Sequence, residues 1–341
     1  MLVRGATGLA VAAKVSPVII GLTVVAFGTS APELAVSVTS CYAGSTDLAI
    51  GNAVGSNITN ILLILGLSAV AMPLSVHVRL FRLDIPIMIL AAGALWALAA
   101  NGQLSRLEGI FLTIALLVYL SWTVIEGRRE DRELRAEMSE AVQSEEIKKH
   151  GSIPLGALLV ICGLALLVIG SDWLVDACVE LAHRWGISEL VIGLTVVAIG
   201  TSLPELVTSV MASLRGHRDL AVGNVIGSNI FNVLGVLGPS AIVAPHAIGV
   251  DEQSLRFDIP VMFAVSVTCL PVFLAGFRIT RWEGLCMVLY YALYVAYLVY
   301  KSGSTPEAVT PWSTTLWFLT PLAGILVVSL IGYLRRRARQ D

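Results

Sequence analysis

Long apolar runs alternate with short polar segments along nearly the whole chain. A bilayer core about 30 Å thick is crossed by about 20 apolar helical residues, so each run of that length predicts a transmembrane helix. Ten such runs are present, near residues 17–42, 47–73, 84–100, 107–126, 153–175, 189–214, 219–245, 258–276, 282–300 and 314–334. The pattern predicts an all-α polytopic membrane protein with the lipid bilayer as its surroundings.

The composition agrees with this prediction and narrows the function. Of the 341 residues, 56% are hydrophobic and 13% are charged, whereas soluble domains carry roughly 25% charged residues. The five cysteines are scattered through apolar segments without metal-ligand spacing, and the sequence shows neither an HExxH motif nor a Ser-His-Asp arrangement. We expect no enzymatic activity, no cofactor and no nucleic-acid partner, and we expect the chain to function as a monomer.

The basic residues predict the orientation in the membrane. When loops are assigned alternately to the two sides, 18 of the 22 Lys and Arg residues fall on one side, which marks it as cytoplasmic in an inner (plasma) membrane. The linker 127–151 and the C-terminus are then cytoplasmic, and the linker is too short for a folded domain. The basic groups on this side are Arg4, Lys14, Arg79, Arg82, six in the linker, Arg215, Arg218, Arg278, Arg281, Arg335, Arg336, Arg337 and Arg339.

A repeat with an offset of 172 residues runs through the chain. The segment GLTVVAFGTSAPE at 21–33 returns as GLTVVAIGTSLPE at 193–205, and DLAIGNAVGSNITN at 47–60 returns as DLAVGNVIGSNIFN at 219–232. About 30 of 50 aligned positions from Gly21 are identical, which predicts a duplicated helical bundle. Weaker echoes pair 82–86 with 256–260 and 106–109 with 281–284.

The two copies are predicted to cross the membrane in opposite directions. Five predicted spans separate the start of one copy from the start of the other, and an odd number reverses the direction of entry. The loop before Asp47 has no basic residue, whereas its counterpart before Asp219 contains Arg215 and Arg218. Inverted repeats of this kind build secondary transporters, in which the substrate site lies near the membrane midplane between the halves.

Each repeat places one glutamate deep in a span, directly after a proline. A carboxylate in hydrocarbon is costly, so Glu33 and Glu205 should face a partner, a cavity or an ion. Pro32 and Pro204 remove backbone hydrogen bonds, and carbonyl groups released at this depth are tolerated only where something else satisfies them, as a bound cation would. Hydroxyl groups recur on the same helix face, at Thr29 and Ser30 in one copy and at Thr201 and Ser202 in the other.

The following span of each repeat carries a polar stripe. The stripe residues recur at i, i+4 and i+8, so each set lies on one face of an apolar helix. They are Asn52, Ser56 and Asn60 in the first copy and Asn224, Ser228 and Asn232 in the second. Hydrogen bonds that only join helices are an alternative role for any one of them, but the doubled set around two glutamates favours an ion site. Intervening glycines at 51, 55, 223 and 227 predict close helix approach.

The candidate ligands are all oxygen atoms. Such a set favours hard cations such as Ca²⁺, Na⁺, Mg²⁺ or K⁺ over zinc or copper. Two carboxylates together with hydroxyl and carbonyl oxygens can supply the roughly six to eight oxygens that Ca²⁺ takes. Two negative charges also favour exchange over leak, because moving an empty, doubly charged site through a barrier of low dielectric constant is costly.

The paired GTSxPE and GNxxGSNIxN motifs resemble the alpha-repeats of the cation/calcium exchanger superfamily, in particular the bacterial sodium/calcium antiporters related to the potassium-dependent exchangers. The resemblance covers nearly all of residues 2–300. It implies two inverted five-helix halves that exchange Na⁺ for Ca²⁺ by alternating access, with Glu33 and Glu205 as the central Ca²⁺ ligands. The other implied ligands are backbone oxygens of Thr29 and Thr201 and, for Na⁺, Ser30, Ser202, Ser56, Ser228, Asn60 and Asn232 with carbonyls near Ala26 and Ala198.

Three features depart from the family pattern. Some relatives carry Asp at the position of Asn232, so K⁺ cotransport and ion stoichiometry stay open. Leu2 aligns with Leu174, so we expect the family's first helix to be missing. The 314–334 span lies outside the ten-helix plan. The expected domains are a first exchanger half at 1–126, the linker 127–151, a second half at 152–301, and an extra C-terminal helix with a basic tail at 302–341.

Two groups of residues have structural roles in this interpretation. Asp84 and Asp258 each precede a proline by two residues, which predicts helix capping. The later tyrosines of the 282–300 span, up to Tyr300, are predicted to anchor the helix at the outer membrane interface.

Two other functions stay open. Proton-coupled or broad divalent-cation antiport would give a Ca²⁺ flux that is driven by pH and indifferent to Na⁺. A cation-binding membrane scaffold would hold the ion without moving it, and only a flux assay separates it from a transporter.

Overall fold

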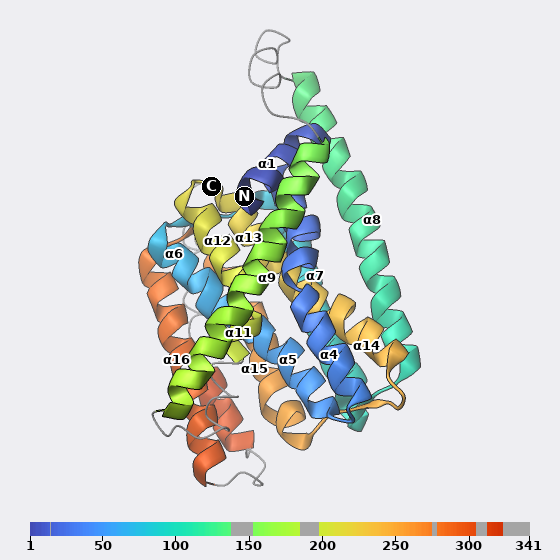
Figure 1. Ribbon diagram of the computed structural model, residues 1–341, viewed down its shortest axis with the longest axis vertical. Helices are drawn as coiled ribbons and strands as arrows, with labels where there is room; N and C mark the ends of the chain where they lie inside the picture. The colour runs from blue at the N-terminus through green and yellow to red at the C-terminus, as the bar shows by residue number, and fades with distance from the viewer. Residues whose placement is uncertain (14, 138–152, 185–197, 275–277, 305–311, 323–341) are drawn as a thin grey trace, which may run out of the picture.

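The computed structural model describes residues 1–13, 15–137, 153–184, 198–274, 278–304 and 312–322. These residues form a bundle of helices with two short two-stranded ladders (Figure 1). The elements of the first half are α1 Leu2–Ala13, α2 Pro17–Ile20, η1 Gly21–Val25, α3 Ala26–Thr29, α4 Ala31–Tyr42, α5 Thr46–Thr59, η2 Asn60–Leu65, α6 Gly66–Ala71, β1 Leu74–Ser75, η3 Leu80–Asp84, α7 Ile85–Leu98, η4 Ala99–Asn101, β2 Gln103–Leu104 and α8 Arg106–Glu137.

The second half repeats this order. Its elements are α9 Ile153–Arg184, α11 Ala198–Thr201, α12 Leu203–Leu214, α13 Arg218–Phe231, η7 Asn232–Leu237, α14 Gly238–Val243, β3 Ile248–Gly249, η8 Ser254–Asp258, α15 Ile259–Leu274, β4 Arg278–Ile279 and α16 Arg281–Ser304. Residues 312–322 are helical as well.

Seven of the ten predicted spans correspond to membrane-length units in the described residues. Six continuous helical stretches are long and apolar enough to cross a membrane, and the pair Pro17–Thr29 and Ala31–Tyr42 makes a seventh, bent by 41°. Of the other three, α15 occupies the 258–276 span, and the spans at 189–214 and 314–334 are described only from 198 and up to 322. The helix α8 continues to Glu137, into the predicted linker, whose residues 138–151 lie outside the described residues.

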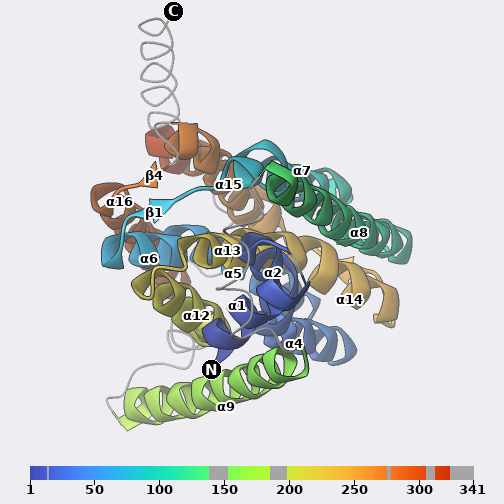
Figure 2. The ribbon, with the colours of Figure 1, turned by 90° about the horizontal axis from the view of Figure 1, so that it is seen from above.

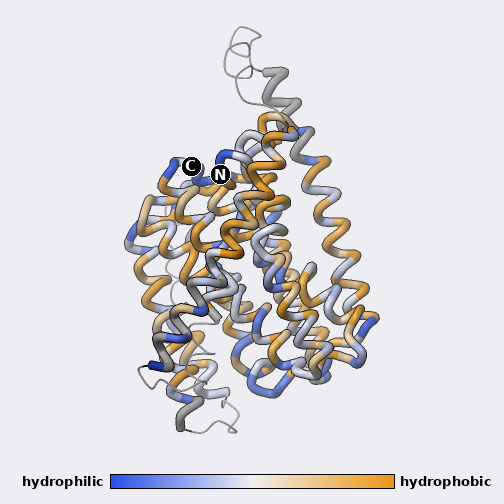
Figure 3. The backbone as a smooth tube through the Cα atoms, viewed as in Figure 1, coloured by the Kyte–Doolittle hydropathy of each residue, from blue (hydrophilic) through white to orange (hydrophobic). Residues whose placement is uncertain are grey.

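Burial separates central helices from lipid-facing ones. In the span Arg218–Val243, 94% of the apolar window is buried, and in Thr46–Ala71 the share is 78%. The share falls to 17% in Ile153–Ser171 and 22% in Arg281–Lys301. Hydrophobic residues colour the outer helices α8 and α9 along much of their length (Figure 3), and exposed apolar faces of this kind are expected in lipid. The two polar stripes therefore lie on the two innermost spans.

Short strands join the two halves at both ends of the bundle. Strand β1 pairs antiparallel with β4, and β2 pairs antiparallel with β3, so each ladder takes one strand from each half. The helix α7 crosses between β1 and β2, which places the two ladders at opposite ends of that span. The segments at 72–79 and 278–281 therefore lie on one side and those at 101–106 and 244–253 on the other, in agreement with the alternating assignment of loops.

Close contacts at glycines also join the two halves. A Cβ at Gly109 of α8 would lie 2.8 Å from the carbonyl oxygen of Gly238 in α14, and a Cβ at Gly284 of α16 would lie 2.6 Å from that of Gly66 in α6. Both distances are below van der Waals contact, so only glycine permits these crossings. Each outer helix thus packs against the opposite half.

The helix α1 lies along α9 in both ribbon views (Figure 2). A Cβ at Gly5 would lie 2.9 Å from the Gly156 carbonyl oxygen, and one at Gly163 would lie 2.7 Å from the Leu2 nitrogen. This helix was not among the predicted spans. By the 172-residue offset, Leu2 corresponds to Leu174, so α1 occupies the place that the end of α9 occupies in the other half.

The capping prediction for the two aspartates is wrong. The π-helical turn η3 continues directly into α7, and Asp84 has helical dihedral angles and no side-chain cap. Its carboxylate instead accepts a hydrogen bond from the Tyr119 hydroxyl at 3.0 Å and lies 3.8 Å from Nε of Arg79. In the second half, Asp258 accepts a hydrogen bond from the Tyr294 hydroxyl at 2.9 Å. Each aspartate therefore ties the start of a span to the final helix of its own half.

The interface-anchor prediction is wrong for Tyr294 and agrees with the exposure of Tyr300. Tyr294 is 5% exposed and stacks on Phe257 with ring centroids 6.2 Å apart. Tyr297 packs against Phe318, which lies in the helical segment 312–322. Tyr300 is 71% exposed. The aromatic rings thus dock residues 312–322 onto α16, a packing role that periodicity within one helix did not reveal.

Replacing Asp84 with alanine is expected to destabilise the first half. The change removes the carboxylate beside a guanidinium that is 4% exposed, and removing one partner of a buried ion pair costs about 3–5 kcal/mol. The thermal unfolding midpoint of the purified protein in detergent measures the loss. The control Asp176→Ala removes an exposed carboxylate on α9 and should leave the midpoint unchanged; equal midpoints for the two variants would contradict the assigned role of Asp84.

Candidate cation site

Both glutamate-bearing spans break at the same serine. Ser30, with φ −87° and ψ 6°, separates α3 from α4, and Ser202, with φ −91° and ψ 8°, separates α11 from α12. Each following helix begins with a proline in its first two positions and the glutamate in its first turn. Proline cannot donate the next backbone hydrogen bond and its ring clashes with the preceding turn, which accounts for the break. The two prolines expected to remove backbone hydrogen bonds thus coincide with a break in the helix in both halves.

The two glutamates meet through reciprocal hydrogen bonds between the halves. The Ser30 hydroxyl donates to Oε1 of Glu205 at 3.2 Å, and the Ser202 hydroxyl donates to Oε1 of Glu33 at 3.5 Å. Glu33 is 0% exposed and Glu205 is 1% exposed. Segments 172 residues apart in the chain thus build one buried acidic centre.

The polar stripes surround this centre. The Ser202 hydroxyl also lies 3.3 Å from the Ser56 hydroxyl of α5. The Thr29 hydroxyl donates to Oδ1 of Asn224 at 3.3 Å. The backbone carbonyl of Ala26 accepts from the Ser30 amide at 3.0 Å. Contacts from both stripes therefore reach the serines and threonines beside the glutamates.

Two stripe residues have the structural role that the sequence left open as an alternative. Asn52 donates from Nδ2 to the Glu33 carbonyl oxygen and to the Ser37 hydroxyl, both at 3.0 Å. Its counterpart Asn224 donates from Nδ2 to the Ser209 hydroxyl at 2.9 Å. These bonds fasten α5 to α4 and α13 to α12, so both asparagines hold the glutamate helices in place.

Several buried oxygen atoms on the two glutamates and on the stripe-bearing spans have no hydrogen-bond donor within the described residues. They are Oε2 of Glu33, Oε2 of Glu205, Oδ1 of Asn60, Oγ of Ser228, Oδ1 of Asn229 and Oδ1 of Asn232. A buried polar atom without a partner costs about 1–3 kcal/mol, and native interiors contain few of them. Dehydrated cations can satisfy buried oxygen atoms of this kind. The donor set therefore fits a hard cation of the kind predicted from the sequence.

The other predicted ligands lie at irregular points or at the ends of the helices that carry the two motifs. Asn60 and Asn232 each begin a π-helical turn, a backbone irregularity that is common at functional sites. Thr201 is partly exposed at the end of α11, and Ala198 begins that helix. The described residues hold no cluster of three or more His, Cys, Asp or Glu side chains, so a cation here would rely on two carboxylates and neutral oxygens.

Sequence reasoning missed Asn57 and Asn229. Both are buried, and the Asn57 amide donates to the Asn229 backbone carbonyl oxygen at 3.2 Å. They lie one position beyond Ser56 and Ser228, outside the i, i+4, i+8 stripe, so helical periodicity did not select them. Their exact recurrence at the 172-residue offset was the available signal.

The close helix approach predicted from the glycines is confirmed at Gly223 and Gly227. A Cβ at Gly223 would lie 2.9 Å from the Val18 carbonyl oxygen, and one at Gly227 would lie 2.8 Å from Cα of Leu22. The central helix α13 therefore contacts α2 and η1 backbone to backbone. Gly51 and Gly55 have no neighbour within 4 Å among the described residues, and the counterpart of the Val18 segment lies outside them.

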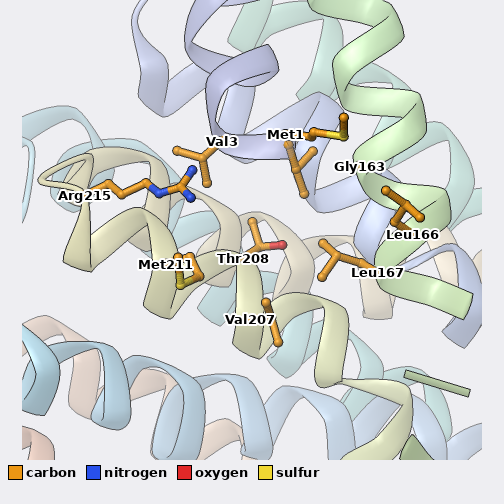
Figure 4. Close-up of a pocket in the computed structure, with 10 residues that line it drawn as sticks. Met1, Val3, Gly163, Leu166, Leu167, Val207, Thr208, Met211 and Arg215 are labelled. Carbon is orange, nitrogen blue, oxygen red and sulfur yellow. The ribbon is translucent and has the colours of Figure 1, made fainter. Parts of the chain in front are cut away.

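A cavity of about 240 Å³ opens between α1, α9 and α12 (Figure 4). Its walls are mostly apolar, with Leu166, Leu167 and Met211 among the lining residues, and Arg215 lies on its α12 side. Thr208, one turn beyond Glu205, also lines it, and its hydroxyl has no hydrogen-bond partner among the described residues. The cavity thus follows α12 from the turn after Glu205 toward the end of that helix.

Comparison with known proteins identifies the family. A model of the sodium/calcium exchanger protein family matches residues 1–125 and 155–300. This chain belongs to the sodium/calcium exchanger family. The matched ranges contain both glutamates and both stripes.

Several individual proteins are similar to this chain. The sodium/calcium exchanger MaX1 of Methanosarcina acetivorans is 33% identical over 87% of this chain and 93% of its own length. The inner membrane protein YrbG of Escherichia coli is 41% identical over 74% of this chain and 77% of its own. The structure of the sodium-calcium exchanger NCX_Mj soaked with 10 mM Na⁺ and 10 mM Sr²⁺ matches with a TM-score of 0.72 and 32% identity, covering 86% of this chain and 91% of that one.

These matches confirm the expected fold class, an all-α polytopic membrane protein with two inverted helical repeats. As an exchanger-family member, the protein is a multi-pass membrane transporter of cations, and its family is one of transporters.

Proposed function

We propose that this exchanger moves Ca²⁺ in exchange for Na⁺ across the plasma membrane by alternating access, at a site centred on Glu33 and Glu205. The observation that supports this proposal is the reciprocal pair of Ser–Glu hydrogen bonds around buried carboxylate oxygens that have no donor in the described part of the chain. A site built equally from both halves is one that a change in their packing can open to either side.

The charge of the site favours exchange over leak. With both carboxylates ionised, the empty site carries a charge of about −2 in a region of low dielectric constant, where uncompensated charge is strongly disfavoured. One Ca²⁺ balances that charge, and so do Na⁺ ions bound together. The loaded forms therefore change conformation more easily than the empty form, which couples the two ion fluxes.

We assign the remaining ligands as the repeat suggests. Backbone oxygens of Thr29 and Thr201 add to the Ca²⁺ site, and neutral oxygens of the serines, Asn60 and Asn232 add to the Na⁺ sites. In this proposal the carbonyl groups of Ala26 and Ala198 complete the set, and Ser56 and Ser228 are among the serines. We propose that the protein functions as a monomer, because a single chain contains both repeats and therefore both halves of the site.

Access to the site is proposed to alternate around the two serine breaks. The cavity between α1, α9 and α12 reaches Thr208, one turn from Glu205, and has Arg215 at the end that the basic residues predict to be cytoplasmic. The pair formed by α1 and α9 covers this path, so its displacement would open or close it. The linker 127–151 and the C-terminus are placed in the cytoplasm on the same charge argument.

The deciding experiment is Ca²⁺ uptake into proteoliposomes that contain the purified protein. Uptake driven by an outward Na⁺ gradient, and absent with choline in place of Na⁺, is the expected result. Uptake that follows an imposed pH gradient and ignores Na⁺ would replace this proposal with proton-coupled antiport. Saturable Ca²⁺ binding without uptake under any gradient would leave a cation-binding scaffold.

The two serines should contribute equally. Ser30→Ala and Ser202→Ala each remove one hydroxyl from the opposite half's glutamate, and a hydrogen bond to a charged group is worth about 1.5–3 kcal/mol. We expect each variant to raise the half-saturating Na⁺ concentration for Ca²⁺ uptake about 10-fold or more. The control Ser121→Ala removes an exposed hydroxyl bonded within α8 and should have no effect. A strong effect of only one serine would argue against a site shared by both halves.

A further inference from the structure

Hydrogen bonds link three asparagines between α5 and the helix formed by α13 and η7, at the candidate site. The Asn57 side chain donates from Nδ2 to the Asn229 backbone carbonyl oxygen at 3.2 Å, and Asn232 donates from Nδ2 to Oδ1 of Asn57 at 3.1 Å. All three residues are at most 2% exposed. Asn57 directly follows Ser56, whose hydroxyl contacts Ser202, so the three hydrogen-bonded asparagines adjoin the acidic centre.

The direction of these hydrogen bonds is fixed at one end. A backbone carbonyl can only accept, so the Asn57 group that faces Asn229 must be its NH₂. The sulfur of Met262, a weak acceptor, lies 3.5 Å from the same nitrogen and agrees with this orientation. Oδ1 of Asn57 must then face Asn232, whose own NH₂ donates to it. The Asn232 carboxamide oxygen is left pointing away from Asn57.

That oxygen is one of the buried atoms without a donor among the described residues. Because a carboxamide is planar, holding its nitrogen also holds its oxygen, and Asn232 cannot turn its NH₂ toward a cation without losing the bond to Asn57. The interaction thus presents a neutral oxygen, and never an NH₂ group, to a bound ion.

The first half lacks the equivalent interaction. The pseudo-symmetric counterpart of Asn57 is Asn229, and its side chain donates to the Val225 carbonyl oxygen of its own helix at 3.1 Å. The counterpart of Asn232 is Asn60, and neither its Nδ2 nor its Oδ1 has a partner in the described part of the chain. The Asn232 carboxamide is therefore held in a single orientation, whereas no hydrogen bond among the described residues holds the Asn60 carboxamide.

We propose that Asn57 is a positioning residue that fixes the Asn232 carboxamide oxygen as a ligand for Na⁺. The inference rests on the proposed function, in which Asn232 serves the Na⁺ sites. A neutral oxygen adds a ligand without adding charge, so it favours binding of monovalent ions while the two carboxylates bind Ca²⁺. Loss of Asn57 should therefore weaken Na⁺ binding selectively.

The test compares Na⁺ and Ca²⁺ dependence in an Asn57→Ala variant, with Asn57→Leu as a second variant that preserves side-chain volume. Na⁺ binding is read from the rise of the thermal unfolding midpoint with NaCl against choline chloride, and separately from Na⁺-driven Ca²⁺ uptake. We expect the half-saturating Na⁺ concentration to rise about 3- to 10-fold in both measurements, as for loss of one hydrogen bond. The half-saturating Ca²⁺ concentration should change by less than about twofold.

A double-mutant cycle separates positioning from general loosening of the core. If Asn57 acts through Asn232, then Asn57→Ala has no further effect on Na⁺ dependence in an Asn232→Ala background. The control cycle combines Asn52→Ala with Asn232→Ala, whose effects should multiply because Asn52 bonds to Glu33 and Ser37 instead.

Two results would overturn the inference: effects of Asn57→Ala and Asn232→Ala that multiply, or an equal loss of Na⁺ and Ca²⁺ affinity in both Asn57 variants. The midpoint measurement needs no transport. A protein without Na⁺-driven uptake would therefore contradict the proposed function, while the cycle in Na⁺ binding would still decide the role of Asn57.

Discussion

Neutralising either central glutamate should abolish exchange. Glu33→Gln and Glu205→Gln each keep the shape of the side chain and remove one of the two buried charges. Losing a charge from the centre should cost at least about 3 kcal/mol of cation binding, so Na⁺-driven Ca²⁺ uptake should fall about 100-fold or more in each variant. Uptake of labelled Ca²⁺ into proteoliposomes, normalised to protein in the vesicles, measures this loss.

The matched control for both is Glu180→Gln. Glu180 lies on α9, and its side chain is 66% exposed beside Arg184. An exposed ion pair of this kind contributes little to stability, so uptake should stay within about twofold of the wild type. Substantial Na⁺-driven uptake in either central variant, with correct folding, would exclude a site that depends on two carboxylates.

The second large effect is expected at the crossings between the halves. Gly284→Leu forces a side chain into the backbone carbonyl of Gly66, and Gly109→Leu forces one into that of Gly238. Both clashes are with backbone atoms, which cannot move aside as a flexible side chain can. Overpacking typically costs about 1–3 kcal/mol, and a clash with backbone falls at or above the top of that range. We expect both variants to lose most of the folded protein, measured as the monodisperse fraction in size-exclusion chromatography in detergent.

The control Ala292→Leu places the same side chain on the exposed face of α16. Lipid tails accept leucine without penalty, so this variant should elute as the wild type does. Normal elution of Gly284→Leu would mean that α16 and the opposite half are not held at the observed separation.

The sequence was sufficient for the bundle and for its acidic centre. Doubled motifs showed which residues are equivalent, and the cost of burying charge predicted that Glu33 and Glu205 face a partner, a cavity or an ion. Features that depend on contacts between distant segments were not accessible in this way. Asp84 looked like a cap because capping is local, and only the packing of α8 shows that Tyr119 and Arg79 bind it.

The same limit explains the asparagines. The stripe at i, i+4 and i+8 selected Asn60 and Asn232 correctly as buried residues, but it could not separate asparagines that fasten helices from those with unsatisfied oxygens. Asn52 and Asn224 turn out to fasten helices, and Asn57, off the stripe, bridges α5 and α13. Hydrogen-bond direction is a property of assembled helices, and no periodicity within one helix contains it.

The reciprocal contacts between halves have a consequence for the origin of the fold. Each half leaves a glycine crossing, a strand edge and a serine that only the opposite half completes. Since the halves run in opposite directions, a single ancestral half could have closed these contacts only with a second copy inserted upside down. A chain of half this length that entered the membrane both ways, and whose gene later fused with its duplicate, would leave the 172-residue repeat seen here. An opposite bias of basic residues in the two copies would then hold each copy in one orientation.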